Sequence, residues 1–115
     1  MYTTKDIESL KNMVIEIVNP DKIVLFGSYA YGEPSDKSDI DLLVIKNGNT
    51  MKDITLDDEV KFDVQLFNER ILRGIDIRFD IFYRTDKQVM ETARKGGAFV
   101  DAINKGVVIY ERFDN

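Results

Sequence analysis

The chain has 115 residues, of which 43% are hydrophobic and 10% aromatic, so it can bury one modest core and is not a disordered polymer. It contains no cysteine and no histidine, which excludes a disulfide framework, a thiolate nucleophile, Ser-His-Asp chemistry and histidine-liganded zinc. The net charge is -5 with scattered lysines and arginines, which argues against a nucleic-acid surface. We expect a single domain over residues 1–115.

The composition also bears on location and on metal binding. No apolar run approaches the ~20 residues that cross a bilayer, and the polar N-terminus lacks the apolar region of a signal peptide. Together with the missing cysteines, this predicts a cytoplasmic protein without membrane contact. Without histidine or cysteine, a metal site must be built from oxygen ligands, which favours Mg²⁺ or Mn²⁺.

Residues 3–18 form the first predicted element, an amphipathic helix. Apolar side chains recur at helical spacing: Ile7, Leu10, Val14 and Ile17. Thr3 and Asp6 have the spacing of a capping box, and Asn19 with Pro20 ends the helix. We expect this helix to cover one face of a sheet.

The apolar run at residues 22–26 predicts a buried strand, which Gly27 and Ser28 interrupt. We expect a tight turn here, followed by one helical turn over residues 29–31. Glycine has no Cβ, so backbone N–H groups can approach a phosphate closely, and the Ser28 hydroxyl can donate a hydrogen bond. On its own, a Gly-Ser pair is usually an ordinary turn.

After a polar loop at residues 33–38, residues 39–46 predict a second strand, which the Asn-Gly-Asn sequence at 47–49 ends. Side chains alternate along a strand, so Asp39 and Asp41 project from the same face. Two adjacent carboxylates repel each other, and a divalent cation is the simplest way to offset that repulsion. Aspartates of a turn or a helix cap are the alternative.

These residues carry a resemblance to a known family. The pattern Gly27-Ser28, ten residues, Asp39-x-Asp41 resembles the signature of the DNA polymerase beta-like nucleotidyltransferase superfamily. The short length and the form of the motif resemble its minimal nucleotidyltransferase branch, whose members often act as antitoxins beside a HEPN-domain toxin. The resemblance implies an α/β fold in which helices pack on a small, mixed, twisted sheet. Tyr31 stands where many relatives carry arginine, so its role is open between stacking and packing.

A third carboxylate is expected on a strand over residues 75–84. Asp80 begins a segment that resembles the family's Asp, three hydrophobic residues, any residue, Thr. Asp76 would share its face and is the reserve candidate. Arg78 lies between them and is expected to form an ion pair, with a phosphate contact as the alternative.

The remaining elements are helical apart from a final strand. We expect a loop over residues 50–55 and a helix over 56–72, with Gly74 after its end and an acidic, solvated first turn. This helix carries an apolar stripe: Val60, Val64, Phe67 and Ile71. A capping box at Thr85 and Gln88 predicts a helix toward Lys105, interrupted at residues 96–97, and residues 107–110 form the last strand.

The resemblance implies transfer of a nucleoside monophosphate from a nucleoside triphosphate with release of pyrophosphate. Two Mg²⁺ ions, or Mn²⁺, would be held by Asp39 and Asp41, and Asp80 would bind the metal that activates the acceptor hydroxyl or act as general base. Gly27 and Ser28 would position the phosphates. Ser38 would take part in nucleotide binding or bond to the backbone.

The acceptor stays open at this level. The family suggests ATP as donor and a tyrosine of a HEPN toxin as acceptor, which would make the protein an antitoxin. A small-molecule hydroxyl, such as that of an aminoglycoside, is a second interpretation. A non-catalytic module that neutralises its partner by contact is a third, and homo-oligomerisation is open.

Overall fold

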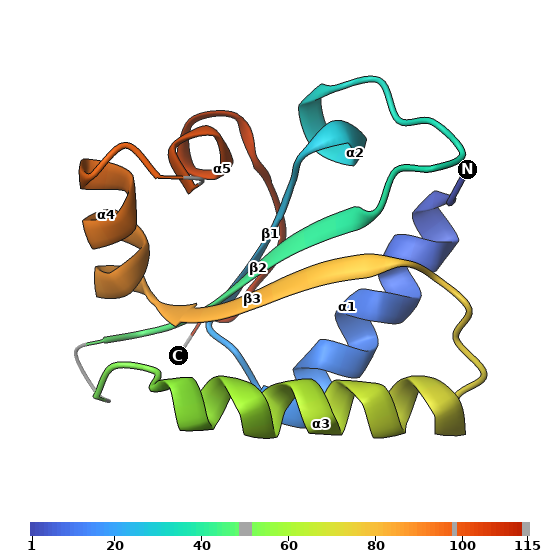
Figure 1. Ribbon diagram of the computed structural model, residues 1–115, viewed down its shortest axis with the longest axis horizontal. Helices are drawn as coiled ribbons and strands as arrows, with labels where there is room; N and C mark the ends of the chain where they lie inside the picture. Colours follow the sequence, from blue (N-terminus) through green and yellow to red (C-terminus); the bar gives the residue numbers. More distant parts are fainter. Residues whose placement is uncertain (49–51, 98, 114–115) are drawn as a thin grey trace.

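The computed structural model describes residues 1–48, 52–97 and 99–113. Its centre is a four-stranded sheet in the order β3-β2-β1-β4 (Figure 1). The strands are β1 (Lys22–Phe26), β2 (Ile40–Lys46), β3 (Phe79–Thr85) and β4 (Val107–Glu111). β1 runs antiparallel to β2 and β4, whereas β2 and β3 are parallel. The α/β fold with a small, mixed, twisted sheet is therefore confirmed.

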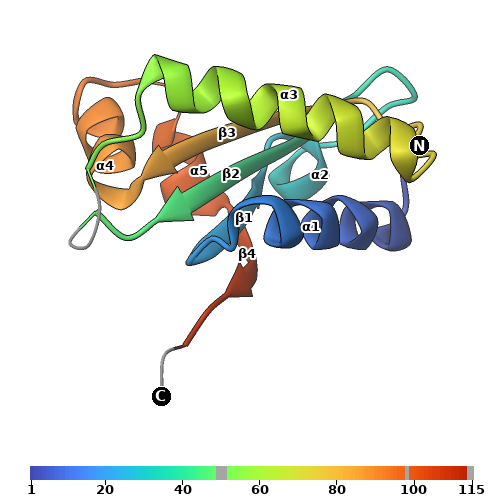
Figure 2. The same ribbon diagram turned by 90° about the horizontal axis from the view of Figure 1, so that it is seen from below.

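Helices cover both faces of the sheet (Figures 1 and 2). α1 (Thr4–Val18) and α3 (Leu56–Leu72) lie on one face. α4 (Asp86–Arg94) and α5 (Phe99–Lys105) lie on the other, and the short α2 (Ser28–Tyr31) follows β1 directly. Within the described residues, no helix is both long and apolar enough to cross a membrane.

Three helices begin where local sequence dictates. Each has a capping box, in which the threonine side chain accepts a hydrogen bond from the backbone N–H three residues later, and the side chain of that later residue accepts one from the threonine N–H. The pairs are Thr3 with Asp6, Thr55 with Asp58 and Thr85 with Gln88. These bonds satisfy N–H groups that the helix itself leaves free, which is why the predicted helix starts are confirmed within one residue.

Alternation along β1 divides the core into two clusters. Ile23 and Leu25 face α1 and α3, whereas Val24 and Phe26 face α4 and α5. The second cluster is rich in aromatic rings, and Phe99 of α5 packs edge-on against Phe26 at a centroid distance of 6.3 Å. Both faces of β1 are thus buried, as its continuous apolar run predicts.

One strand boundary differs from the prediction by more than one residue, and the predicted interruption of the last helix can now be described. β3 begins at Phe79 rather than residue 75, because β2 offers no partner before the Ile40–Phe79 pair. The Arg78 N–H instead donates to the Tyr2 hydroxyl at 2.8 Å. The segment from Thr85 to Lys105 forms two helices, with Gly96 at a positive φ of 75° between them. The predicted interruption at residues 96–97 therefore divides the segment into two separate helices. The part of the predicted loop at residues 50–51 falls outside the described residues.

The α3 helix has the predicted bounds, but its apolar stripe does not face the sheet. Phe62 and Leu66 form the buried face, with exposed fractions of 2% and 4%. The stripe is more than half exposed at every position: Val60, Val64, Phe67 and Ile71. The helix therefore has two apolar faces, one of them in solvent.

Candidate functional site

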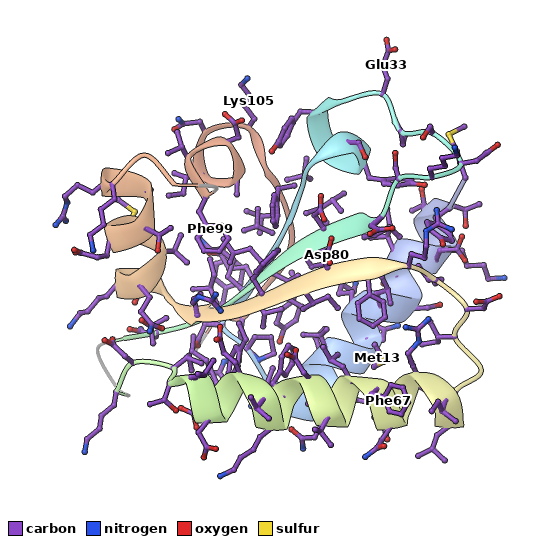
Figure 3. The ribbon with its side chains drawn as sticks, in the orientation of Figure 1. Met13, Glu33, Phe67, Asp80, Phe99 and Lys105 are labelled. Carbon is purple, nitrogen blue, oxygen red and sulfur yellow. The ribbon has the colours of Figure 1, made fainter. Side chains whose placement is uncertain are left out.

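The predicted carboxylates lie at the end of the sheet where β1 ends and β2 and β3 begin. Asp41 is the register partner of Phe26 in β1 and of Asp80 in β3. Asp41 shares its face of β2 with Leu43, which belongs to the cluster under α4 and α5. Asp80 projects on the side of the sheet where α2 and α5 lie (Figure 3). Parallel pairing of β2 and β3 therefore brings the two carboxylates together.

Gly27 makes the closest approach to Asp41. Its φ of 72° lies in the left-handed region, and a Cβ built on it would stand 2.1 Å from Asp41 Oδ2. The carboxylate therefore occupies the space where any other residue would carry a side chain. The predicted phosphate turn and the predicted Asp pair meet at this contact.

The turn after β1 leaves donors near the carboxylates. The Gly27 carbonyl accepts hydrogen bonds from the N–H groups of Ala30 and Tyr31, which closes the first turn of α2. The N–H groups of Ser28 and Tyr29 donate to no acceptor within residues 1–48, 52–97 and 99–113. The predicted phosphate turn thus has two backbone donors, with the Ser28 hydroxyl beside them.

Asp41 is the electrostatically strained member of the group. Burial raises the pKa of Asp41 above its ordinary value of 3.8, and the negative charges of Asp80 and Asp39 raise it further. Within the described parts of the chain, neither Asp41 nor Asp80 forms an ion pair with a lysine or arginine. The fold therefore places Asp41 and Asp80 side by side with no lysine or arginine paired to either of them in the described residues.

Asp39 is held differently. Its Oδ1 lies 3.1 Å from Arg78 Nε, and Arg78 Nη2 donates to the Asp36 carbonyl at 2.6 Å. The predicted ion pair of Arg78 is thus formed with Asp39, on the loop before β2. In the described segments, accordingly, no group of three acidic side chains is close enough to share a metal ion.

Comparison with known proteins bears on the fold and the chemistry. Residues 8–115 match the family described as "Polymerase beta, Nucleotidyltransferase". The chain belongs to this nucleotidyltransferase family.

Comparisons of this nucleotidyltransferase with solved structures and with curated proteins add little to the family assignment. The crystal structure of a "putative nucleotidyltransferase" from Sulfolobus solfataricus is similar, with 21% sequence identity and a TM-score of 0.49. The similarity covers 96% of this chain and 91% of that one. Among curated proteins, no significant match was found.

Nucleotidyltransferases of this family use divalent metals, and the donor set here can be tested against that requirement. Asp41 and Asp80 supply uncompensated carboxylate oxygens, which hard divalent cations prefer. Asp39 could join them once its carboxylate leaves Arg78. The residues present therefore fit an oxygen-liganded cation.

The other predicted site residues have different surroundings. The Ser38 hydroxyl accepts a hydrogen bond from the Ser35 N–H at 2.9 Å, so it stabilises the loop between α2 and β2. Asp76 is exposed and lies outside β3, and the strand register does not pair it with Asp41. The structure thus brings Gly27, Asp41 and Asp80 together and leaves Ser38 in a turn.

Two residues near the site were not predicted. The Tyr2 hydroxyl accepts the Arg78 N–H, and its ring lies 5.6 Å from the guanidinium carbon of Arg78. The ammonium of Lys105 on α5 lies 5.9 Å from the ring centroid of Tyr31 on α2. Both contacts join segments more than seventy residues apart in sequence. A local sequence pattern cannot predict contacts between segments so far apart.

Proposed function

We propose that this nucleotidyltransferase transfers AMP from ATP, with Mg²⁺, to a tyrosine hydroxyl of a HEPN-domain toxin and thereby acts as an antitoxin. The contact between Gly27 and the Asp41 carboxylate, with Asp80 beside it, is the observation that carries the proposal. It joins a turn with unused backbone donors to a pair of carboxylates that have no lysine or arginine partner in the described residues.

Each residue has a role that its surroundings support. The N–H groups of Ser28 and Tyr29 and the Ser28 hydroxyl bind terminal phosphate oxygens, which need several donors. Asp41, Asp80 and Asp39 would hold Mg²⁺ or Mn²⁺, which supplies charge neutralisation and activates the acceptor hydroxyl when bound. Asp80 is the most exposed to an incoming acceptor and would take the proton of that hydroxyl.

The position of a groove elsewhere on the sheet favours a large acceptor, because that groove does not enclose the carboxylates. A groove of 490 Å³ lies on the same sheet face but at the other end, between α4, α5, β1 and β4. Neither Asp41 nor Asp80 lines this groove. Small-molecule sites are usually enclosed by walls, whereas a protein acceptor brings its own surface to an open site.

Co-expression with a HEPN protein encoded by a neighbouring reading frame tests the proposal. Mass spectrometry should find one added AMP unit on a tyrosine of that protein. The Asp41→Asn variant should lose the modification, by analogy with the large losses that follow removal of metal-binding or charge-stabilising groups. Asp76→Asn is the matched control, because Asp76 is an exposed carboxylate near β3 outside the pair, and it should keep full transfer.

A HEPN partner that stays unmodified, yet is neutralised equally well by the Asp39→Asn chain, would overturn transfer. That result would establish the non-catalytic binding module instead. Loss of transfer in Asp76→Asn but not in an Asp80→Asn variant would show that Asp76, and not Asp80, is the third carboxylate.

A further inference from the structure

The exposed stripe of α3 has the geometry of a helix-pairing surface. Val60, Val64, Phe67 and Ile71 are spaced four, three and four residues apart, which is the spacing of a two-helix seam. Their exposed fractions are 53%, 53%, 60% and 62%. In Figures 1 and 2, α3 is an outermost element, and no other described element lies across it.

The stripe is separate from the core face of the helix. Phe62 and Leu66 already bury the side of α3 that faces the sheet, and Phe62 packs on Tyr83 at a centroid distance of 5.0 Å. Single exposed apolar residues are ordinary, but a continuous row along a helix usually marks an interaction site. The buried side of α3 is therefore supplied by Phe62 and Leu66 and not by this row.

We propose that the α3 stripe binds the α3 stripe of a second copy of this chain, in an antiparallel pair related by a two-fold axis. The centre of the row lies between Val64 and Phe67, so each copy would place Val64 against Phe67 of the other. Val60 would then face Ile71 of the second copy. A two-fold axis makes one row self-complementary, so no second patch is needed.

The charges beside the stripe select the antiparallel arrangement. The first half of α3 is acidic, with Asp57, Asp58 and Glu59 in its first turn, whereas Arg70 lies in its last turn. Asp63 and Arg70 are seven residues apart and therefore lie along the same flank of the stripe. Antiparallel pairing brings Asp63 of one copy beside Arg70 of the other, twice per dimer. Parallel pairing would oppose the two acidic halves and align the helix dipoles unfavourably.

Arg70 is held in position for such a contact. Its Nη2 donates to the Ile77 carbonyl at 3.3 Å, and its guanidinium lies 5.2 Å from the centroid of the Phe79 ring. A guanidinium has five N–H donors, so the carbonyl contact leaves donors for a carboxylate. Asp63 is exposed.

Sedimentation equilibrium of the full chain tests self-association. The wild-type chain should reach the mass of two chains as its concentration rises. Val64→Lys and Phe67→Lys should keep it monomeric over the same range, and Asp63→Lys should weaken the dimer about tenfold or more through like-charge contact. Met90→Lys, at a 54% exposed position on α4, and Asp101→Lys on α5 are the matched controls and should leave dimerisation unchanged.

The orientation has its own test, because the chain contains no cysteine. Val60→Cys and Ile71→Cys chains are mixed and oxidised, and the products are distinguished by mass. The antiparallel pair predicts that the mixed disulfide exceeds both symmetric ones. A wild-type chain that stays monomeric at every concentration would overturn the proposal, as would preferential cross-linking of two Val60→Cys chains.

Discussion

Asp41 is an acidic residue that the fold crowds and does not neutralise. It lies against the backbone of Gly27, with Asp80 beside it on β3 and Asp39 two residues away. Asp39, by contrast, has Arg78 as a partner. The strain is therefore concentrated on one carboxylate, where a bound cation would relieve it.

Replacing Asp41 by asparagine should leave the metal-free protein as stable as the wild type or more stable at neutral pH. Burial raises the pKa of Asp41 above 3.8, so the folded chain binds this proton more tightly than the unfolded chain. The free energy of unfolding of the wild type therefore falls as pH rises from 3.8 through the raised pKa. The advantage of Asp41→Asn should appear across that window and vanish at lower pH.

Thermal denaturation in chelator, repeated across pH for both chains, measures this difference. A large loss of stability in Asp41→Asn at neutral pH would show that the carboxylate is a structural cap. Asp76→Asn, at an exposed position outside the cluster, is the control and should leave the melting temperature at neutral pH unchanged.

Local sequence signals point to the candidate residues of the site, but not to the residues that they contact. Gly27, Ser28 and Asp41 are close in sequence, and the turn after β1 brings Gly27 against Asp41, whereas Asp39 lies on the loop before β2 and not in the strand. The contact of Arg78 with Asp39 and that of Tyr2 with Arg78 depend on how distant segments pack. Such contacts have no local signal, so only the folded chain reveals them.

At the level of elements, α3 shows that apolar periodicity does not identify the buried face. Two rows on this helix are apolar, and the sheet takes the row that contains Phe62 and Leu66. The longer row was the obvious one in the sequence. Helix bounds were predictable because capping boxes and glycines act locally, whereas the rotation of a helix about its axis is set by tertiary packing.

Two phenylalanines of α3 provide a matched pair of substitutions. Phe62→Ala should lower the free energy of unfolding by about 3–5 kcal/mol, since it opens a cavity beside Tyr83. Phe67→Ala, at a 60% exposed position, should change it by no more than about 0.5 kcal/mol in the dilute monomer. Chemical denaturation at low protein concentration measures both values, and equal losses would mean that the stripe belongs to the core.

On the scale of the whole molecule, an acidic protein of net charge -5 has to bind a polyanionic nucleotide if it is to transfer AMP. Long-range electrostatics oppose that encounter, so local donors and bound cations must outweigh them. This favours a nucleotide that arrives with its own Mg²⁺. The melting temperature of the protein can show whether the nucleotide and Mg²⁺ bind together.

ATP with Mg²⁺ should therefore raise the melting temperature more than ATP with excess chelator. A ligand present at a hundred times its dissociation constant adds about 2.7 kcal/mol to the free energy of unfolding. Ser28→Ala should reduce the shift, because one phosphate donor is removed. Differential scanning fluorimetry measures the shifts, and equal shifts with and without Mg²⁺ would contradict metal-bridged binding.

The parallel pairing of β2 with β3 also determines at which stage of folding Asp41 and Asp80 come together. Asp41 and Asp80 become neighbours only after the whole crossover through α3 has closed, whereas β1 and β2 join through a short connection. Non-local parallel pairing is slow compared with local contacts. In a chain still emerging from the ribosome, β1, the glycine turn and β2 are all present before β3 has been made, so the pair cannot yet assemble. Completion of the tertiary structure thus acts as the final step in building the site.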